Sequence, residues 1–125
     1  MDHNMVGWFE IPVTDMERVR KFYETVFNIS LQVQDFGGTL MGWFPFANGK
    51  TGSSGSLIQN EAYTPSKSEG VLIYFSSVDV SNELTRIPEA GGTVLQSKTL
   101  ISEDIGYMAL FLDTEGNRIA LHSRK

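Results

Sequence analysis

The chain has 125 residues, of which 41% are hydrophobic and 20% charged, and its formal net charge is −5. These values are typical of one globular domain with a core of its own, and they exclude a disordered chain. The acidic balance argues against binding to nucleic acid or to anionic lipid. Because there is no cysteine, disulfides, thiolate metal sites and a cysteine nucleophile are excluded. The sequence shows neither a secretory signal nor a membrane span, so the cytoplasm is the expected compartment.

The first half of the chain predicts a strand, a helix and three further strands. Residues 6–13 alternate between apolar and polar side chains, as a half-buried strand does. Thr14 and Glu17 have the spacing of a capping box, which places Thr14 at the N-cap of a helix. That helix carries an apolar stripe, and Asn28 favours a left-handed residue at its end. The strands that follow are predicted at residues 31–36, 39–46 and 52–59.

The same order restarts at Gly70. A strand is predicted at 71–77, a short helix at 80–87 with Asp79 as its cap, and strands at 93–102, 107–112 and 117–122. The two halves align at one offset of about 64 positions, so that Asp15 corresponds to Asp79 and Gly42-Trp43 to Gly106-Tyr107. The predicted fold is α+β: a single domain over 1–125 with two βαβββ modules (about 5–60 and 70–123) joined by a linker at about 61–69. The modules are expected to form a curved mixed sheet with a cleft between them and helices outside.

Two segments resemble the vicinal-oxygen-chelate superfamily, which contains glyoxalases, bleomycin-resistance proteins and extradiol dioxygenases. Residues 9–15 (FEIPVTD), with Lys21-Phe22-Tyr23, resemble its opening strand and helix, and residues 105–118 (IGYMALFLDTEGNR) resemble its closing hairpin. The resemblance covers nearly the whole chain. It identifies the superfamily well and the reaction poorly, since the superfamily hosts isomerases, dioxygenases, transferases and metal-free binders.

The resemblance also identifies where metal-dependent members hold their ion. Aligned on these motifs, the four ligand positions are Trp8, Ser56, Leu72 and Ala120. A divalent ion is bound by imidazole and carboxylate donors from facing strands, and none of these residues supplies one. No metal site and no cofactor are therefore expected. His3 and His122 are the only histidines that a rebuilt site could use.

The cleft between the modules is the predicted ligand-binding site. The strand faces that point away from the helices are expected to line it, with Trp43 and Tyr107 on equivalent strands closing its sides. The predicted ligand-binding residues are Trp8, Glu10, Trp43, Leu72, Tyr74, Tyr107, Arg118, Ala120 and His122. A carboxylate beside aromatic rings needs a partner, so Glu10 is expected to meet Arg118 or a cationic ligand.

These features leave more than one function open. The leading hypothesis is a metal-free binding protein of the bleomycin-resistance type, a homodimer by resemblance, which holds a small aromatic or cationic molecule. The alternative is a glyoxalase-like lyase or dioxygenase-related enzyme with an unrecognised metal or acid–base site, for which Glu10 and His122 are a candidate pair. Trp8 has a structural alternative as well, because it can fill the space of a lost metal. The sequence assigns no catalytic residue and names no ligand.

Overall fold

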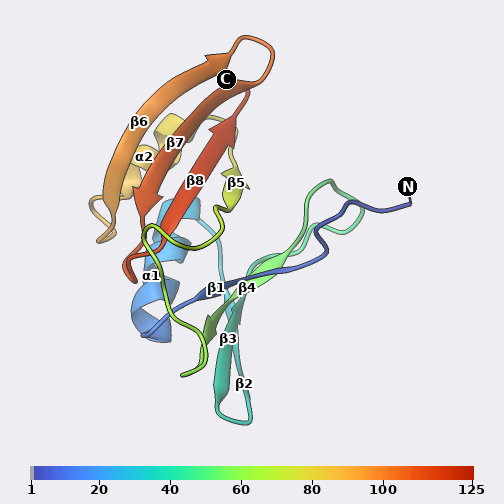
Figure 1. The fold of residues 1–125 in the computed structure, drawn as a ribbon, viewed down its shortest axis with the longest axis vertical. Coiled ribbons are helices and arrows are strands. Elements are labelled where there is room, and N and C mark those ends of the chain that lie inside the picture. Colours follow the sequence, from blue (N-terminus) through green and yellow to red (C-terminus); the bar gives the residue numbers. More distant parts are fainter. Residues whose placement is uncertain (1) are drawn as a thin grey trace.

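The computed structural model describes residues 2–125, and both modules have the predicted order of elements (Figure 1). Module one contains β1 (Phe9–Pro12), α1 (Met16–Phe27), β2 (Gln32–Phe36), β3 (Thr39–Trp43) and β4 (Gly55–Gln59). Module two contains β5 (Tyr74–Ser76), α2 (Val80–Arg86), β6 (Thr93–Ser102), β7 (Gly106–Leu112) and β8 (Arg118–Ser123). The predicted α+β fold with two βαβββ modules is confirmed. Neither helix is long and apolar enough to cross a membrane.

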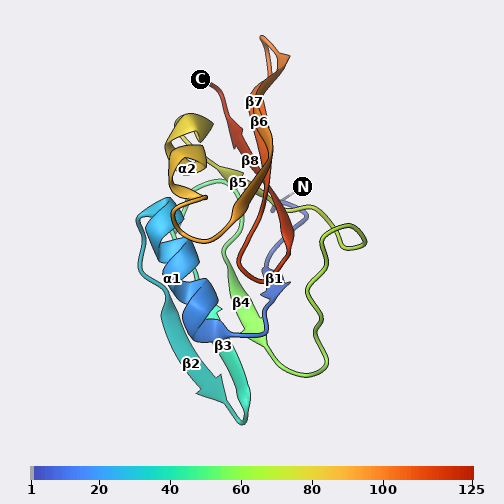
Figure 2. The ribbon, with the colours of Figure 1, turned by 90° about the vertical axis from the view of Figure 1, so that its left-hand side faces the viewer.

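Each module forms one four-stranded mixed sheet. The order is β1-β4-β3-β2 in the first sheet, called sheet A, and β5-β8-β7-β6 in the second, called sheet B. The first strand of each module runs parallel to the last, and the remaining pairs are antiparallel. Both helices lie on one side of the sheets, where α1 and α2 are in contact (Figure 2). Within residues 2–125, no helix covers the opposite side of either sheet.

One hydrophobic core continues across both modules. Phe22 of α1 packs against Phe111 of β7, with ring centroids 6.0 Å apart, and Ile87 at the end of α2 joins the same cluster as Ile11. Phe22, Phe111 and Ile87 are at most 1% exposed. Because burial of apolar surface is the main favourable term in folding, the shared core makes the modules depend on each other.

The start of α1 differs from the predicted capping box. Asp15, rather than Thr14, is the N-cap, and its carboxylate accepts the amide of Arg18 at 3.1 Å. Thr14 instead directs its amide and hydroxyl to Glu115 of module two. At the other end of the helix, Asn28 has φ 55°, as predicted.

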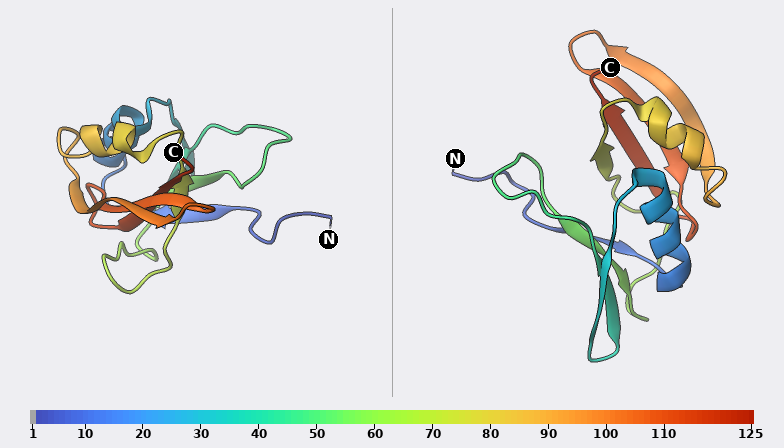
Figure 3. Two further views of the ribbon diagram at one scale, coloured as in Figure 1. Left: turned by 90° about the horizontal axis from the view of Figure 1, so that it is seen from above. Right: turned by 180° about the vertical axis from the view of Figure 1, so that it is seen from behind.

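Five strands are shorter than predicted: β2 loses one residue, and the larger differences lie around the β3–β4 connection and in the edge strands β1 and β5. β3 ends at Trp43 instead of residue 46 because Pro45 has no amide with which to continue a ladder. β4 begins at Gly55 rather than Gly52. The edge strands β1 and β5 retain four and three residues of the predicted eight and seven. Residues 2–8 and those between β3 and β4 extend together away from the sheets (Figures 1 and 3).

The modules do not align at one offset throughout. Gln32 pairs with Trp43, eleven positions later, whereas Gln96 pairs with Leu110, fourteen positions later. Trp43 then pairs with Ser56 after thirteen positions, and Leu110 with Ala120 after ten. The first hairpin of module two is thus three residues longer and its second hairpin three residues shorter. Leu110, and not Tyr107, is therefore the counterpart of Trp43.

The turn between β7 and β8 joins the two modules. Its Glu115 side chain, which is 0% exposed, accepts hydrogen bonds from the amides of Thr14 and Asp15 and from the Arg18 guanidinium at 2.7–3.0 Å. Asn117 donates from Nδ2 to the Pro12 carbonyl at 2.7 Å. The equivalent connection in module one is longer and makes no such contact with module two among the hydrogen bonds of residues 2–125.

The same turn also anchors the body of α1. The buried phenol of Tyr23 donates to Asp113 Oδ2 at 2.8 Å, and the other oxygen of that carboxylate accepts the amides of Glu115 and Asn117. Burial raises the pKa of Tyr23 well above that of a free phenol, with the neighbouring Asp113 carboxylate adding to the effect. Tyr23 is therefore a neutral donor at physiological pH, and it ties α1 to the second module.

Candidate functional site

The face of sheet A that points away from the helices carries the first part of the predicted site. Glu10 pairs with Ser56 and Ser56 with Trp43, so these residues form one row across β1, β4 and β3. Trp8 lies on the same face as Glu10 because side chains two apart on an extended segment point the same way. The opposite faces of these strands are packed, as Ile11 and Leu57 are 3% and 0% exposed.

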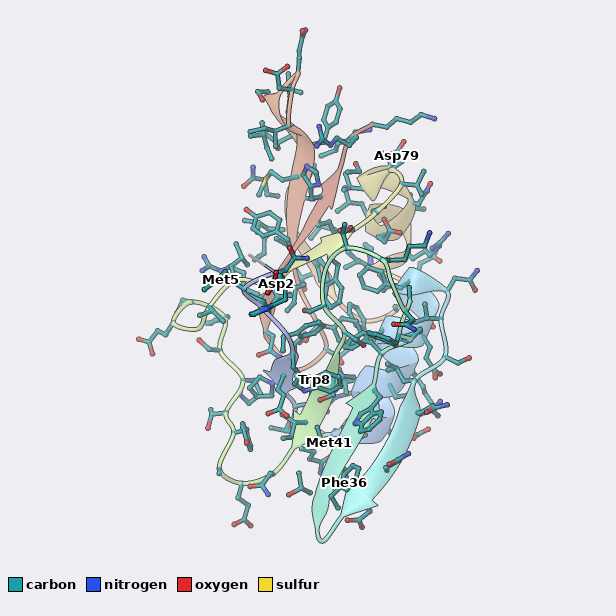
Figure 4. The ribbon with its side chains drawn as sticks, turned by 90° about the vertical axis from the view of Figure 1, so that its right-hand side faces the viewer. Asp2, Met5, Trp8, Phe36, Met41 and Asp79 are labelled. Atoms are coloured by element: carbon teal, nitrogen blue, oxygen red, sulfur yellow. The ribbon has the colours of Figure 1, made fainter. Side chains whose placement is uncertain are left out.

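Three aromatic rings form a continuous row on this open face. The indoles of Trp8 and Trp43 meet edge to face with centroids 5.8 Å apart, and Phe36 of β2 stacks on Trp43 at 6.2 Å. Trp8, Trp43 and Phe36 are 43%, 36% and 49% exposed, although aromatic side chains of this size are normally mostly buried. Figure 4 looks onto this face, with Trp8, Met41 and Phe36 directed outwards from sheet A. The row offers flat aromatic surface to a planar or cationic molecule.

Glu10 lies beside this row as an exposed carboxylate. Among residues 2–125, none of the ion pairs includes Glu10, and Arg118 lies on β8 of the other sheet. The expected pairing of Glu10 with Arg118 is not formed. The carboxylate remains available to a cation from outside the chain.

Ser56 is the one buried side chain of the described residues whose polar atom has no partner. Its residue is 0% exposed, and Oγ makes no hydrogen bond. It occupies a position that holds a metal ligand in metal-dependent members of the resembled superfamily. A buried hydroxyl without a partner costs free energy, so its presence in the row with Trp43 and Glu10 is unusual.

The four metal-ligand positions do not fit a divalent metal. Glu10 pairs with Ser56 just as Tyr74 pairs with Ala120, so Ser56 and Ala120 are equivalent positions. Trp8 lies two residues before Glu10 and Leu72 two residues before Tyr74, so these two positions are equivalent as well. An indole, a hydroxyl, an isobutyl group and a methyl group provide no imidazole or carboxylate donor. Residues 2–125 contain no cluster of three His, Asp or Glu side chains able to hold an ion.

The second part of the predicted site lies on the open face of sheet B. Tyr74 pairs with Ala120 and Ala120 with Leu110, and Arg118 and His122 flank Ala120 on the same face. Tyr74 is 51% exposed, whereas Ala120 is fully buried. His122 is held by a contact of 2.7 Å between Nε2 and the Ile105 carbonyl. Among residues 2–125, no ion pair or side-chain hydrogen bond joins His122 to Glu10, so the structure does not form the acid–base pair of these two residues.

Tyr107 does not belong to this face, and its placement in the cleft was wrong. It precedes Ala109 and Phe111 at alternate positions, and both of those residues are 0% exposed in the core. Tyr107 therefore packs against the core on the helix side, with Lys98 Nζ 4.5 Å from its ring centroid. The constant offset of about 64 positions aligned Tyr107 with Trp43, whereas the counterpart of Trp43 is Leu110, three residues later. Because three is an odd number, Tyr107 and Leu110 point to opposite faces of the strand.

The remaining predicted residues are divided between the two sheets. Trp8, Glu10 and Trp43 lie on sheet A, and Arg118, Ala120 and His122 lie on sheet B. Leu72 and Tyr74 line a cavity between the modules that includes none of those six. Sequence reasoning missed Phe36, which completes the aromatic row. Phe36 lies two residues after Gln34 and four after Gln32, which places all three on one face of β2, and the Gln32–Trp43 pair then puts that face beside Trp43.

Comparisons with known proteins agree with this fold. The family model described as Glyoxalase/Bleomycin resistance protein/Dioxygenase superfamily matches residues 5–121. A relative from Didymella fabae, described as a glyoxylase-like domain-containing protein, is 27% identical over 127 residues, covering 98% of this chain and 95% of its own.

Solved structures show the same fold at lower identity. TnmS3, an antibiotic binding protein from Streptomyces sp. CB03234, superposes with a TM-score of 0.67 and 23% identity, covering 100% of this chain and 99% of its own. Glyoxalase I from Zea mays superposes with a TM-score of 0.73 and 21% identity over 94% of this chain. That alignment spans only 45% of the maize protein, so this chain corresponds to less than half of it. The family match covers both modules and every predicted site residue except His122, and the chain therefore belongs to the glyoxalase/bleomycin resistance protein/dioxygenase superfamily.

Proposed function

We propose that this chain is a metal-free small-molecule-binding protein that holds a cationic aromatic ligand on the open face of sheet A. The observation that carries the proposal is the exposed Trp8–Trp43 pair, with centroids 5.8 Å apart, beside the unpaired carboxylate of Glu10. An indole face attracts a cation through its quadrupole, and a nearby carboxylate adds a charge of the opposite sign. TnmS3, which has the same fold, is described as an antibiotic binding protein, and this agrees with the proposal.

The open face of sheet B is proposed as the second wall of the cleft. Tyr74 supplies a half-exposed aromatic ring there, and Leu72 and Ala120 supply apolar surface. Arg118 and His122 stand at the polar end of this wall. A site of this composition, mostly aromatic and apolar with few polar groups, suits a small organic molecule.

The proposal is tested by a thermal-stabilisation screen of cationic aromatic amines, followed by affinity measurements on each hit. A ligand that binds the folded state raises the unfolding temperature, so hits are found without knowledge of the natural ligand. Tryptophan fluorescence then reports binding, with Trp43→Phe as the background in which Trp8 is the single tryptophan. Replacing Trp8 by Ala is expected to cost about 1–3 kcal/mol, or about 5- to 150-fold in affinity.

Glu10→Gln distinguishes the contribution of the carboxylate charge to ligand affinity from that of the aromatic rings. It is expected to weaken every cationic hit and to leave the affinity of a neutral isostere unchanged, since the substitution removes only the carboxylate charge. Glu103→Gln, in the exposed β6–β7 turn, is the matched control. If Trp8→Ala binds all hits as tightly as the parent chain, Trp8 only fills space on this face and the proposal is refuted.

The metal-free part of the proposal has its own measurement. Elemental analysis of the purified protein is expected to give no stoichiometric transition metal, because none of Trp8, Ser56, Leu72 and Ala120 is a donor for one. About one zinc, nickel or iron per chain would contradict it.

A further inference from the structure

A second cavity, of about 870 Å³, lies between the modules and away from the Trp8–Trp43 pair. Its walls come from the N-terminal segment, the end of α1, the β3–β4 connection and the β5 region. Trp8, Glu10 and Trp43 do not line it. Its volume falls within the range of sites that hold drug-sized molecules.

Four phenylalanines from four segments form the floor of this cavity. Phe75 lies 4.9 Å from Phe27, 5.3 Å from Phe44 and 5.8 Å from Phe9, measured between ring centroids. All four rings pack against the hydrophobic core but are only partly buried. The core therefore ends here in a continuous aromatic surface that an apolar ligand would remove from water.

The lining carries no charge. None of the residues of the described chain that form its walls is Asp, Glu, Lys, Arg or His, although 20% of the whole sequence is charged. The polar groups are hydroxyls and an amide, such as those of Ser53, Thr51 and Asn4. A cation or anion would lose its hydration in this cavity without a partner of opposite charge, which is costly.

We infer that this cavity is a binding site for a neutral, largely apolar aromatic molecule, separate from the proposed cation site on sheet A. The two sites differ in the chemistry that they select. The sheet A site offers two indoles and a carboxylate, whereas this cavity offers phenylalanine rings and uncharged hydroxyls. The inference does not depend on the row of Trp8, Glu10 and Trp43, because none of these residues lines the cavity and the class of ligand differs. Leu72 and Tyr74, which are proposed above for the second wall, also line this cavity.

The neutral dye Nile red is the probe for this site, since its emission brightens and shifts to the blue in apolar surroundings. One saturable site per chain is expected. Neutral 1-ethylnaphthalene should displace the dye, whereas its cationic analogue 1-naphthylmethylammonium should not. Trp8→Ala should leave Nile red binding unchanged, so that failure of the sheet A site is distinguished from failure of this one.

Ser53→Trp blocks the cavity from the β3–β4 connection, where Ser53 is a partly buried lining residue. The affinity for Nile red is expected to fall by about tenfold or more, because the indole fills space that the dye would occupy. Lys50→Trp is the matched control, on the same connection but outside the lining. Ile29→Lys places a charge in the wall and should also lower the affinity for Nile red. Ser30→Lys, at the exposed neighbouring position, should leave that affinity unchanged.

Three results would overturn the inference. One is the absence of saturable Nile red binding by the parent chain. Another is binding that survives both Ser53→Trp and Ile29→Lys in variants whose circular dichroism spectrum is that of the parent. The third is an apparent affinity that falls as the protein concentration rises, which would show that a second copy of the chain covers the cavity.

Discussion

At the scale of single residues, two buried serines have opposite environments. Ser56 Oγ lacks a partner, whereas Ser123 Oγ accepts the Val80 amide at 3.1 Å and donates to the Lys125 carbonyl at 2.9 Å. Both residues are at most 1% exposed. A buried hydroxyl stabilises a protein only when its hydrogen bonds are formed.

Alanine substitution should therefore act differently at these two positions. Ser56→Ala removes an unsatisfied group and is expected to leave the free energy of unfolding unchanged or raise it by up to about 1 kcal/mol. Ser123→Ala leaves the Val80 amide unpaired and should lower it by about 1–2 kcal/mol. Urea denaturation of the two variants beside the parent measures both effects. A loss at Ser56 as large as that at Ser123 would indicate that its hydroxyl has a partner in solution.

The residue scale also separates what the sequence could predict from what it could not. Because side chains alternate along a strand, placing Trp8, Glu10, Ala120 and His122 in the cleft also predicts Phe9, Ile11, Ile119 and Leu121 on the helix side. All four lie in or against the core, since a period of two depends only on local geometry. The missing partner of Glu10 could not be predicted, because whether Arg118 reaches it depends on how the two sheets are placed relative to each other. That placement is set by packing between distant segments.

At the scale of elements, the contact between the β7–β8 turn and the start of α1 depends on the ionisation of Glu115. Burial acts to raise the pKa of Glu115, but hydrogen bonds from Arg18, Thr14 and the Asp15 amide outweigh it and lower the pKa to about 2. An unfolded Glu has a pKa near 4.5. The ionised carboxylate is thus favoured in the folded state, and its stabilising contribution is present above pH 4.5 and is lost as the pH falls towards 2.

Glu115→Gln tests the contribution of this carboxylate to stability. At pH 7 it is expected to lower the free energy of unfolding by about 1–3 kcal/mol, because charge-assisted hydrogen bonds to Arg18 and the helix amides are weakened. The difference from the parent should shrink as the pH is lowered from 4.5 to 2, since Glu115 of the unfolded parent binds a proton below about pH 4.5 whereas that of the folded parent stays ionised down to about pH 2. Urea unfolding at pH 7 and pH 3 measures it, with Glu103→Gln as an exposed control. A difference that does not change with pH would contradict the lowered pKa.

Element identities were more predictable than their ends. Both helices and all eight strands follow from hydrophobic periodicity and turn residues, and β6 has its predicted bounds. The N-cap of α1 was predicted at Thr14 because the capping-box spacing is local. In the folded chain, Glu115, about a hundred residues away, takes the Thr14 hydroxyl, and Asp15 caps the helix instead. No local pattern reveals a competing partner at that distance.

At the scale of the whole molecule, the open faces and the projecting segment favour a homodimer. Phe46 is 69% exposed on the β3–β4 connection, which projects from the sheets (Figure 3), and it does not line the cavity of about 870 Å³. A large apolar side chain exposed on a projection is typical of a surface that meets another chain. A second copy that packs against Phe46 would bury surface that one chain leaves in water.

Light scattering is expected to give twice the chain mass of 13.9 kDa at micromolar concentration. Phe46→Glu should shift the equilibrium towards monomer, because it places a charge on the proposed contact. Val78→Glu is the control, since Val78 is 79% exposed but lies before α2, away from the projection. A parent chain that is monomeric at micromolar concentration would refute the homodimer.

The unequal hairpins of the two modules also limit how the repeat can be recombined. A chimera built on the constant offset of 64 positions, with residues 96–107 in place of residues 32–43, would put Tyr107 at the position of Trp43 and end the hairpin three residues early. Three is odd, so the side chains of β7 would change sides and its core residues would face away from the helices. A single hairpin keeps its register only when the paired positions are exchanged, residues 96–110 for residues 32–43. Over the three strands from β2 to β4, or from β6 to β8, the two length differences cancel, so only this longer segment can be exchanged at the constant offset.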